Sequence, residues 1–451
     1  MKRLNKLNVL NEEIWLLESL YSGKIISPLE YRRFCCCDAK IQEVRIVRNT
    51  ILMDLTHTWK SGSQTGIQNY SLNLANAMLK INPNILFVSN EKGVIRKIEM
   101  GLLAGKVSIK LKIFYSLRSL WKNRLVKISI IKKILLPFRV PIYYLFYKDS
   151  LSKESIIPVN CRIVAPESIL DNLSVKSLNS IQRFSNNELY LCIHDMFPVT
   201  HPEFTSNYTR DNVANFLDLI FGSTNIICQT ETVRNSLNLL FESRKVISAP
   251  NIFHNPSISV IRRPLVNFEY YESGKKELFN YFVTIGTIEP RKNLLQVLEV
   301  FEELWNSGLD TELHVYGNYG WNCEIERLKI KDLVARGYPL ILKLNPSTKQ
   351  IQENLKKSRG LILASIAEGV GLTPGEAFSL GVPAIVNSIP AVMESYPKEY
   401  LSIYNGTHEG LKKAILSNLN SELDMVSLNK MEVLTWEKTA QDFLRLMGDL
   451  K

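Results

Sequence analysis

The sequence predicts an α/β protein built of two doubly wound domains that face each other across a cleft. The chain has 451 residues, which is too long for one ordinary hydrophobic core and indicates two or three domains. Short apolar runs typical of buried strands alternate with amphipathic helical patterns, and a polar stretch at 267–277 divides this alternation into two halves. Strands that alternate with helices form parallel sheets with right-handed crossovers, so each half predicts one domain.

The first domain is expected at 49–266. It opens with a buried-type strand at 50–55, a loop at 61–66 with the sequence SGSQTG, and a helix at 67–80. Its other strand candidates are 85–89, 161–166, 189–195 and 225–230, and a helical pattern at 231–241 follows the last of them. Residues 1–48 are expected to form a helical extension. Asn and Glu residues interrupt its apolar runs, so it does not read as a signal peptide.

A basic segment at 100–148 lies inside this first domain. No acidic residue stands between Glu99 and Asp149, and the eleven Lys and Arg residues at 106–148 equal the whole net charge of +11. They alternate with apolar and aromatic residues, a pattern typical of interfacial membrane-binding helices. The charges and Pro137 and Pro141 interrupt every candidate spanning run. We therefore expect peripheral contact with an anionic membrane; a solvated helix pair is the alternative, and nucleic acid is not expected because no recognised motif accompanies the charge.

The second domain is expected at 277–430, followed by a helix at 431–451 that packs back toward the first domain. Strand candidates at 281–286, 311–317, 340–345, 360–365 and 383–387 alternate with helical patterns. The seven cysteines show no paired spacing, and Cys35, Cys36 and Cys37 stand in a row, so an incidental cluster in a reduced, cytosolic protein is the simplest interpretation.

Two turns of the second domain carry candidate chemistry. In VTIGTIEPRKNLL, Arg291 and Lys292 stand between a strand and a helix, where cations and a helix N-terminus neutralise a phosphate. In ASIAEGVGLTPGEAFSLGVPAIV, Gly369 and Gly371 permit close backbone approach after a strand. Here Glu376 is placed to accept hydrogen bonds from a vicinal diol, as acidic residues do for ribose, and Glu368 from hydroxyls of a second sugar.

Together these two motifs resemble the retaining glycosyltransferases of family 4, which have the GT-B fold of two Rossmann-like domains. The resemblance extends over most of 50–447 and includes DLTHTWKSGSQTGIQNY, IHDMFPVTHPEF and NIICQTETVRNSL. It implies that the second domain holds a nucleotide sugar and the first domain holds the acceptor.

The resemblance also assigns residue roles. His194, Lys292 and Glu368 would be catalytic. The donor would be bound by residues of both domains: Gly66, Arg291, Lys292, Glu368, Gly369, Gly371, Leu372 and Glu376. Asp195 and Thr65 are acceptor candidates. Departures from the family pattern are Thr287, in place of a second phosphate-binding Arg, and Ala364, Val370 and Thr373 at packing positions of the glutamate motif.

The sequence therefore predicts a retaining hexosyltransferase of bacterial surface-polysaccharide assembly, such as O-antigen or lipopolysaccharide synthesis, with GDP-mannose as the first donor choice. The acceptor would be a lipid-linked glycan or an oligosaccharide at the cytoplasmic face of the cell membrane. We expect no cofactor and no metal, because no Asp-x-Asp-like pair stands in a suitable loop and fixed cations can stabilise the leaving diphosphate. The alternatives are a non-catalytic sugar-nucleotide-binding or scaffolding subunit and a GT-B epimerase, which would need further acid/base carboxylates.

Overall fold

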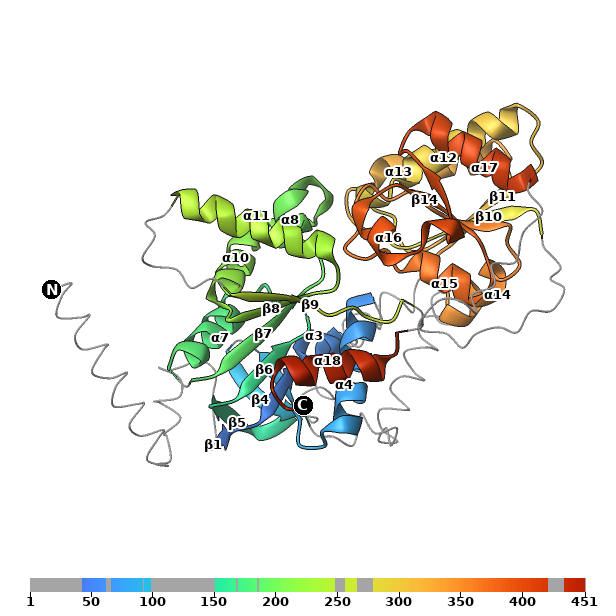
Figure 1. Cartoon of the computed structure of the whole chain (residues 1–451). Coiled ribbons are helices and arrows are strands. Elements are labelled where there is room, and N and C mark those ends of the chain that lie inside the picture. Colours follow the sequence, from blue (N-terminus) through green and yellow to red (C-terminus); the bar gives the residue numbers. More distant parts are fainter. Residues whose placement is uncertain are drawn as a thin grey trace, which may run out of the picture.

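The computed structural model describes residues 43–61, 66–91, 93–98, 151–167, 169–184, 186–247, 256–265, 279–420 and 434–450. The described chain forms two α/β domains that lie beside each other (Figure 1). The basic segment at 100–148, Thr65, Cys35, Cys36 and Cys37 lie outside the described residues. No helix within the described ranges is long and apolar enough to cross a membrane.

The N-terminal domain is built on a nine-stranded sheet in the order β1-β5-β4-β3-β2-β6-β7-β8-β9. Every neighbouring pair is parallel except those of β4 with β3 and with β5. The strands are β1 (Glu43–Arg48), β2 (Ile51–Asp54), β3 (Leu86–Glu91), β4 (Val94–Ile98), β5 (Leu151–Val159), β6 (Arg162–Ala165), β7 (Glu188–Ile193), β8 (Asn225–Cys228) and β9 (Ser257–Val260).

The first strand corrects the expectation for 1–48. Residues 43–48 form β1, which pairs in parallel with β5, whereas a helical extension was expected to reach Arg48. The sequence EVRIVR contains β-branched residues and no helical spacing of apolar side chains, and this composition favours a strand at the edge of a sheet.

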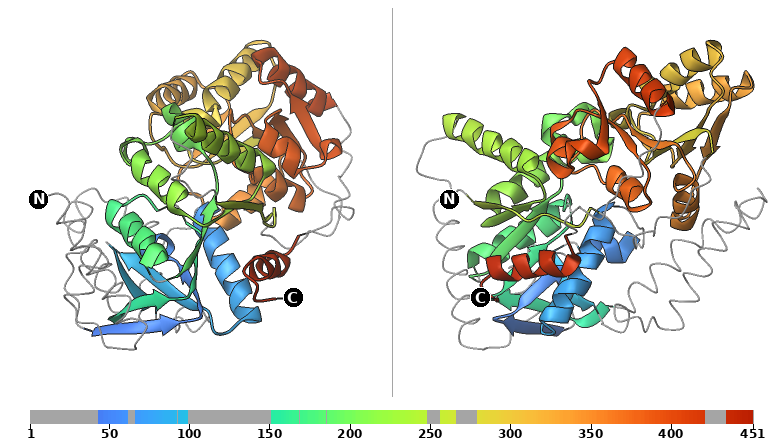
Figure 2. Two further views of the ribbon diagram at one scale, coloured as in Figure 1. Left: turned by 60° about the vertical axis from the view of Figure 1, so that its left-hand side comes forward. Right: turned by 45° about the vertical axis from the view of Figure 1, so that its right-hand side comes forward.

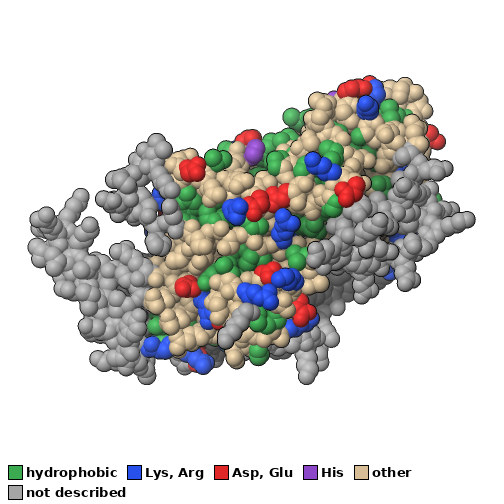
Figure 3. All heavy atoms as spheres, in the orientation of Figure 1, with side chains coloured by type: hydrophobic (Ala, Val, Ile, Leu, Met, Phe, Trp, Pro, Cys, Tyr) green, Lys and Arg blue, Asp and Glu red, His purple; other side chains and the backbone are tan. Residues whose placement is uncertain are grey.

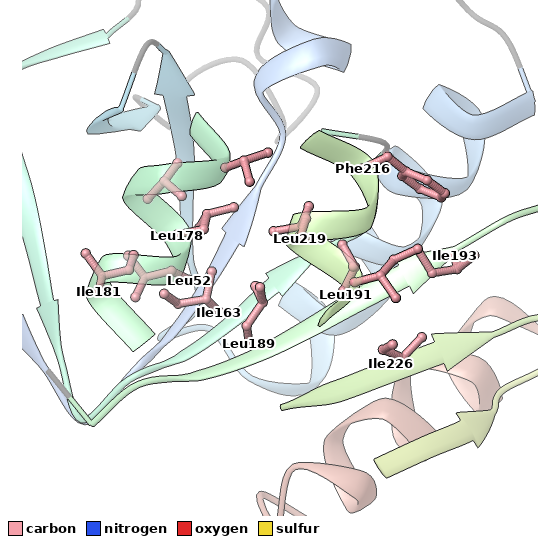
Figure 4. Packing of buried hydrophobic residues seen from close by; sticks show 14 of the residues in the cluster. Leu52, Ile163, Leu178, Ile181, Leu189, Leu191, Ile193, Phe216, Leu219 and Ile226 are labelled. Atoms are coloured by element: carbon pink, nitrogen blue, oxygen red, sulfur yellow. The ribbon is translucent and has the colours of Figure 1, made fainter. Parts of the chain in front are cut away.

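Helices cover both faces of this sheet. They are α3 (Thr56–Ser61), α4 (Gly66–Ile81), α7 (Asn172–Phe184), α8 (Phe197–Thr200), α9 (Asn207–Asp211), α10 (Val213–Gly222) and α11 (Glu231–Ile247), with a short 3-10 helix η3 (Pro202–Phe204). On one face Leu178 and Ile181 of α7 and Leu219 of α10 pack on strand residues such as Leu52 and Leu191 (Figure 4).

The opposite face carries α4 and α18 (Trp436–Leu446), the last helix of the chain. Tyr70 and Leu74 of α4 and Phe443 and Leu444 of α18 belong to one buried cluster. Thr435 caps α18 by accepting a hydrogen bond from the amide of Lys438. Both views of Figure 2 show α18 beside α4, so the chain crosses to the second domain and returns.

The C-terminal domain has a six-stranded parallel sheet in the order β12-β11-β10-β13-β14-β15. The strands are β10 (Tyr281–Ile285), β11 (Glu312–Tyr316), β12 (Leu340–Lys343), β13 (Gly360–Leu363), β14 (Ala384–Asn387) and β15 (Leu401–Tyr404). Its helices are α12 (Leu294–Asn306), α13 (Glu324–Ala335), α14 (Thr348–Leu355), α15 (Thr373–Ser379), α16 (Pro390–Ser395) and α17 (His408–Asn420), with 3-10 helices η4 (Pro290–Lys292) and η5 (Lys398–Tyr400).

The strand order of this sheet locates a binding edge. The numbering decreases from β12 to β10 and then increases from β13 to β15, so the order reverses between β10 and β13. This is the order of Rossmann sheets, in which ligands bind beyond the carboxyl ends of the strands at the reversal. The prediction of an α/β fold with two Rossmann-like domains is confirmed.

Candidate functional site: a cation–carboxylate cluster between two domains

The two motifs of the C-terminal domain meet at the reversal of its sheet. Lys292 ends η4, which follows β10, and Glu368 lies in the loop that follows β13. The backbone amide of Ile366 donates to the carbonyl of Arg291 at 2.8 Å, which ties the two loops together. Residues separated by more than seventy positions in the chain thus form one site.

Two cations and two carboxylates alternate in this site. Lys292 Nζ lies 2.5 Å from Glu368 Oε1, and Arg291 Nη1 lies 2.8 Å from Glu368 Oε2. Arg291 Nη2 also donates to Glu289 Oε1 at 2.6 Å. Arg291 is therefore engaged on both arms of its guanidinium, and the charges within this group balance.

The neighbouring cations decide the ionisation of Glu368. Burial alone would raise the pKa of this carboxyl, but the charges of Lys292 and Arg291 and hydrogen bonds from Lys292 and Ser365 lower the pKa to about 2. Glu368 is therefore a carboxylate at neutral pH. Oε1 accepts from Lys292 and Ser365 and Oε2 from Arg291, so a further hydrogen bond from a sugar hydroxyl can be accepted at Oε2, and one at Oε1 requires Lys292 or Ser365 to move.

Glu376 stands in a different environment, in the first turn of α15. Burial raises the pKa of its carboxyl to about 7, and the charges of Arg263 and Lys292 offset this only in part. No described residue makes a hydrogen bond or ion pair with this carboxylate. A partly buried acceptor without a protein partner fits the diol-binding role that the sequence suggested.

A small hollow of about 20 Å³ opens beside Lys292 at the carboxyl ends of β10 and β13. Its lining combines strand ends with the two loops: Thr284, Ile285, Gly286, Thr287, Ile288, Lys292, Leu294, Val315, Ile362, Leu363, Ala364 and Ser365. Thr287 and Ala364, two of the departures from the family pattern, are therefore wall residues of this hollow.

The glycines of the glutamate motif allow close packing against the other domain. A Cβ at Gly369 would fall 2.0 Å from the carbonyl oxygen of His194, so only glycine fits at this contact. Gly371 has a φ of +78° and leads into Leu372, the N-cap of α15. Leu372 in turn reaches the start of α4, where its Cδ1 would lie 3.7 Å from a Cβ at Gly66.

His194 lies at the carboxyl end of β7, and its ring is fixed on both sides. Nε2 lies 2.7 Å from the carbonyl of Pro166 and Nδ1 lies 2.5 Å from Nε2 of Gln229. A carbonyl only accepts, so the hydrogen is on Nε2 and Nδ1 accepts from Gln229. Burial and the charge of Arg263 lower the pKa of His194 to about 4, against a smaller opposing effect of Pro166. The ring is therefore neutral, and neither nitrogen is free to move a proton.

Asp195 lies within the electrostatic reach of the same cluster. Burial raises the pKa of this carboxyl, the backbone amide of Phe197 and the charge of Arg291 lower it, and Glu368 and Glu289 raise it. Arg291 also lies over the ring of Phe197, with 5.0 Å between the guanidinium carbon and the ring centroid. The cluster of the C-terminal domain thus faces the loop 194–197 of the N-terminal domain.

Direct hydrogen bonds join the two domains to each other beside this site. Thr230 Oγ1 donates to the carbonyl of Gly369 at 2.9 Å. Glu394 of α16 accepts from the amides of Glu231 and Thr232, which begin α11 of the other domain. Figure 1 shows α11 and α16 facing each other across the domain boundary.

Three participants were missed by the sequence analysis. Glu289 precedes Arg291 by two residues and pairs with it, and its place in IEPRK is a signal that was overlooked. Glu394 caps a helix of the other domain, a contact that no local pattern shows. Arg263, in the segment that follows β9, influences both His194 and Glu376, and nothing in IRRPL distinguishes it from a solvated arginine.

The fold and this site define the class of the molecule: two Rossmann-like domains with a charged site between them, the GT-B arrangement. The solved structure of Anabaena Alr3699/HepE in complex with UDP and glucose matches it with a TM-score of 0.54 and 11% sequence identity. The match covers 89% of this chain and 100% of that chain.

Sequence comparison finds similarity mainly in the C-terminal half. Residues 269–432 match the model of the family Glycosyl transferases group 1. The serotype-specific mannosyltransferase WbdA of Escherichia coli is 32% identical over 170 residues, which are 36% of this chain and 20% of that protein. The O-antigen chain mannosyltransferase RfbU of Salmonella typhimurium is 21% identical over 241 residues, 52% of this chain and 62% of that protein. The chain thus matches about a fifth of the length of WbdA and less than two thirds of RfbU.

Proposed function

We propose that this chain is a retaining glycosyltransferase that moves a hexose from a nucleotide diphosphate sugar to a glycan or lipid-linked acceptor in surface-polysaccharide synthesis. The observation that carries the proposal is the contact of Lys292 and Arg291 with Glu368 at the reversal of the C-terminal sheet. The group 1 match over 269–432 and the similarity to two mannosyltransferases support it, and they make GDP-mannose the first donor to test.

In this proposal the ion pairs of the cluster exchange partners when the donor arrives. The diphosphate forms an ion pair with Lys292. Arg291 adds a second positive charge beside the diphosphate while it keeps its contact with Glu289. Glu368, released from Lys292, accepts hydrogen bonds from hydroxyls of the donor sugar. Glu376 accepts from the ribose diol and must be ionised to do so, which its raised pKa permits only toward and above neutral pH.

The bond between C1 of the sugar and the diphosphate oxygen then breaks, and the acceptor oxygen bonds to C1 on the same face. The acceptor hydroxyl proton passes to the leaving diphosphate oxygen. Lys292, Arg291 and the backbone amides near Gly371 and Leu372 stabilise the charge of the leaving group without a metal. His194 is neutral and held by Pro166 and Gln229, so its role is to shape the sugar site through its ring and its carbonyl rather than to move a proton.

The test is transfer itself. Purified protein is incubated with GDP-mannose, UDP-, dTDP- and ADP-sugars and a lipid-linked glycan, and product is measured with the anomeric configuration read by NMR. One donor should give a product of retained configuration, and Lys292→Ala should reduce its formation at least about 100-fold. Donor binding without any transfer would instead support the non-catalytic subunit, and inversion would contradict the retaining mechanism.

We also propose peripheral contact with the cytoplasmic face of the cell membrane through 106–148, on the charge pattern of that segment. Lys132→Glu with Lys133→Glu should release the protein from anionic vesicles in co-sedimentation. The matched control is Lys349→Glu with Lys356→Glu on the C-terminal domain. Equal sedimentation of both double variants and the parent would contradict this contact.

A further inference from the structure

Arg263 is a buried cation that the roles assigned above do not use. Arg263 is only 4% exposed and lies in the segment between β9 and the C-terminal domain. Nη1 donates to the carbonyl of Gly66 at 3.3 Å and Nε to Pro264 at 3.5 Å, both long hydrogen bonds. Nη2 is buried and has no hydrogen-bond partner among the described residues.

The guanidinium is nevertheless held firmly in place. It lies over the rings of Tyr70 and Trp436, at 5.2 and 5.3 Å from their centroids. Tyr70 belongs to α4 and Trp436 to α18, so both contacts come from the N-terminal domain's helical face. A rigid arginine with an unused arm is preorganised to bind an anion.

The surroundings locate that unused arm beside the donor site. Arg263 and Lys292 both act on the carboxyl of Glu376, and Arg263 also acts on His194 of the N-terminal domain. Its contact with Gly66 places it at the N-terminus of α4, a helix of sixteen residues whose dipole adds positive potential. Arg263 therefore lies between the residues of the two domains to which donor binding is assigned.

The charge balance of the site leaves a role for such a cation. Arg291 and Lys292 are matched by Glu289 and Glu368, so this group offers no net positive charge to a donor that carries at least two negative charges. The carboxyls of Glu376 and Asp195 add only negative charge. A third cation, not committed to a carboxylate, would balance the ligand.

We propose that Arg263 is a donor-binding residue whose Nη2 donates to an oxygen of the nucleoside diphosphate, from the N-terminal side of the cleft. This inference rests on the proposed function. Because Arg263 is held by the N-terminal domain and Lys292 by the C-terminal domain, one diphosphate bound by both links the two domains.

The experiment measures binding of GDP, UDP, dTDP and ADP by titration calorimetry at pH 7 and pH 9 to the parent protein, Arg263→Met and Arg263→Lys. Arg45→Met removes an exposed arginine of β1 and is the matched control. With the nucleotide that the parent binds most tightly, Arg263→Met should weaken binding about 10- to 100-fold at both pH values, the size expected for one charge-assisted hydrogen bond. Arg263→Lys should recover part of the loss, and Arg45→Met should bind as the parent does.

Three outcomes overturn the inference. The charged neighbours that face Glu376 are Arg263 and Lys292, with the hydroxyl of Tyr396 close by. If Arg263 acted only by keeping Glu376 ionised, the loss in Arg263→Met would disappear at pH 9, where that carboxyl is ionised without help. Unchanged affinity at both pH values in a folded variant would assign Arg263 to the packing of Tyr70 and Trp436 alone. If the parent protein bound none of the four nucleotides, the proposed function would fail and this inference with it.

Discussion

The two domains place carboxylates at the same position of their sheets and use them in opposite ways. In the N-terminal sheet the strand order reverses between β2 and β6, and Asp54 and Glu167 lie where these strands end. Both side chains are 3% exposed and cap α3: Asp54 accepts from the amide of Thr56, and Glu167 from the amides of His57 and Thr58. In the C-terminal sheet, Glu368 at the corresponding edge binds two cations instead.

The difference appears in the pKa of each group. Burial, together with the charge of the nearby Glu167, raises the pKa of Asp54 to about 7 against hydrogen bonds from Thr56 and Asn90. Glu368 is as enclosed, yet Lys292 and Arg291 bring its pKa to about 2. The position at the sheet reversal therefore does not by itself make a charged ligand site. In the proposed site the cations from the neighbouring loop make the difference, because they keep the carboxylate ionised and would be able to pair with a phosphate. Figure 3 shows acidic and basic side chains interspersed over the face in view.

The largest effect is expected where the two domains come into contact, at Gly369 and His194. Gly369→Ala places a methyl group against the carbonyl of His194, so the domains cannot close and transfer should fall at least about 100-fold, measured as product formation. Gly308→Ala is the control, because nothing lies within 4 Å of a Cβ there although its φ is +88°. Equal activity of the two variants would show that contact between the domains is not needed for transfer.

Glu368→Gln should cost about 2 to 4 kcal/mol of stability at pH 7, because Lys292 and Arg291 lose their shared carboxylate. The pKa of Glu368 is lowered on folding, so its contribution is complete above about pH 4.5 and is lost as the pH falls toward 2. In urea unfolding, the difference in the free energy of unfolding between parent and variant should become smaller below pH 4.5. In Glu353→Gln, which removes an exposed pair with Lys349, the difference should stay below about 0.5 kcal/mol.

Asp54→Asn should show the opposite pH dependence. The folded protein keeps a proton on Asp54 that the unfolded chain releases above its ordinary pKa of 3.8, so the parent loses stability as the pH rises from about 4 to 7. The Asn variant has no such loss because its amide does not titrate in this range, and its oxygen can still accept from the amide of Thr56. Relative to the parent it should gain about 1 to 3 kcal/mol over this range in urea unfolding. Parallel profiles of the parent and Asp54→Asn would show that Asp54 is ionised throughout this range.

The smallest effect is expected at the boundary itself. Glu394→Ala removes the acceptor for the amides of Glu231 and Thr232, a loss of about 1 kcal/mol for a helix cap. Hydrogen exchange of these two amides should accelerate about fivefold. Ser206→Ala, which removes the cap of α9 within a single domain, should leave them unchanged. Unaltered exchange in Glu394→Ala would mean that the Glu394 carboxylate does not protect these two amides.

The sequence predicted the parts of this protein that depend on local periodicity. Buried strands such as β7 and β10 are continuous apolar runs, and the two motifs around Lys292 and Glu368 follow strands of the parallel sheet, so their meeting could be expected from topology. The Rossmann-like fold of both halves followed from the alternation of strands and helices.

What the sequence did not predict depends on contacts between distant segments. Edge strand β1 and its neighbour β5 have mixed patterns, and β1 was taken as part of a helix. The pairing of Glu368 with Lys292, the fixed neutral ring of His194 and the burial of Arg263 each need a partner from another element. Thr65, the second acceptor candidate, stays a prediction outside the described residues, and metal independence stays a prediction as well.

The return of α18 to the N-terminal domain has a consequence for biosynthesis. Ala440, Phe443, Leu444 and Met447 complete the buried cluster around Tyr70 and Met78 of α4. The ribosome makes the N-terminal domain before the C-terminal domain, but the N-terminal domain lacks one wall of its core until α18 emerges. The N-terminal domain therefore completes its core after the C-terminal domain does. A nascent chain that stops near residue 420 would carry a complete C-terminal domain beside an N-terminal domain with an exposed apolar face.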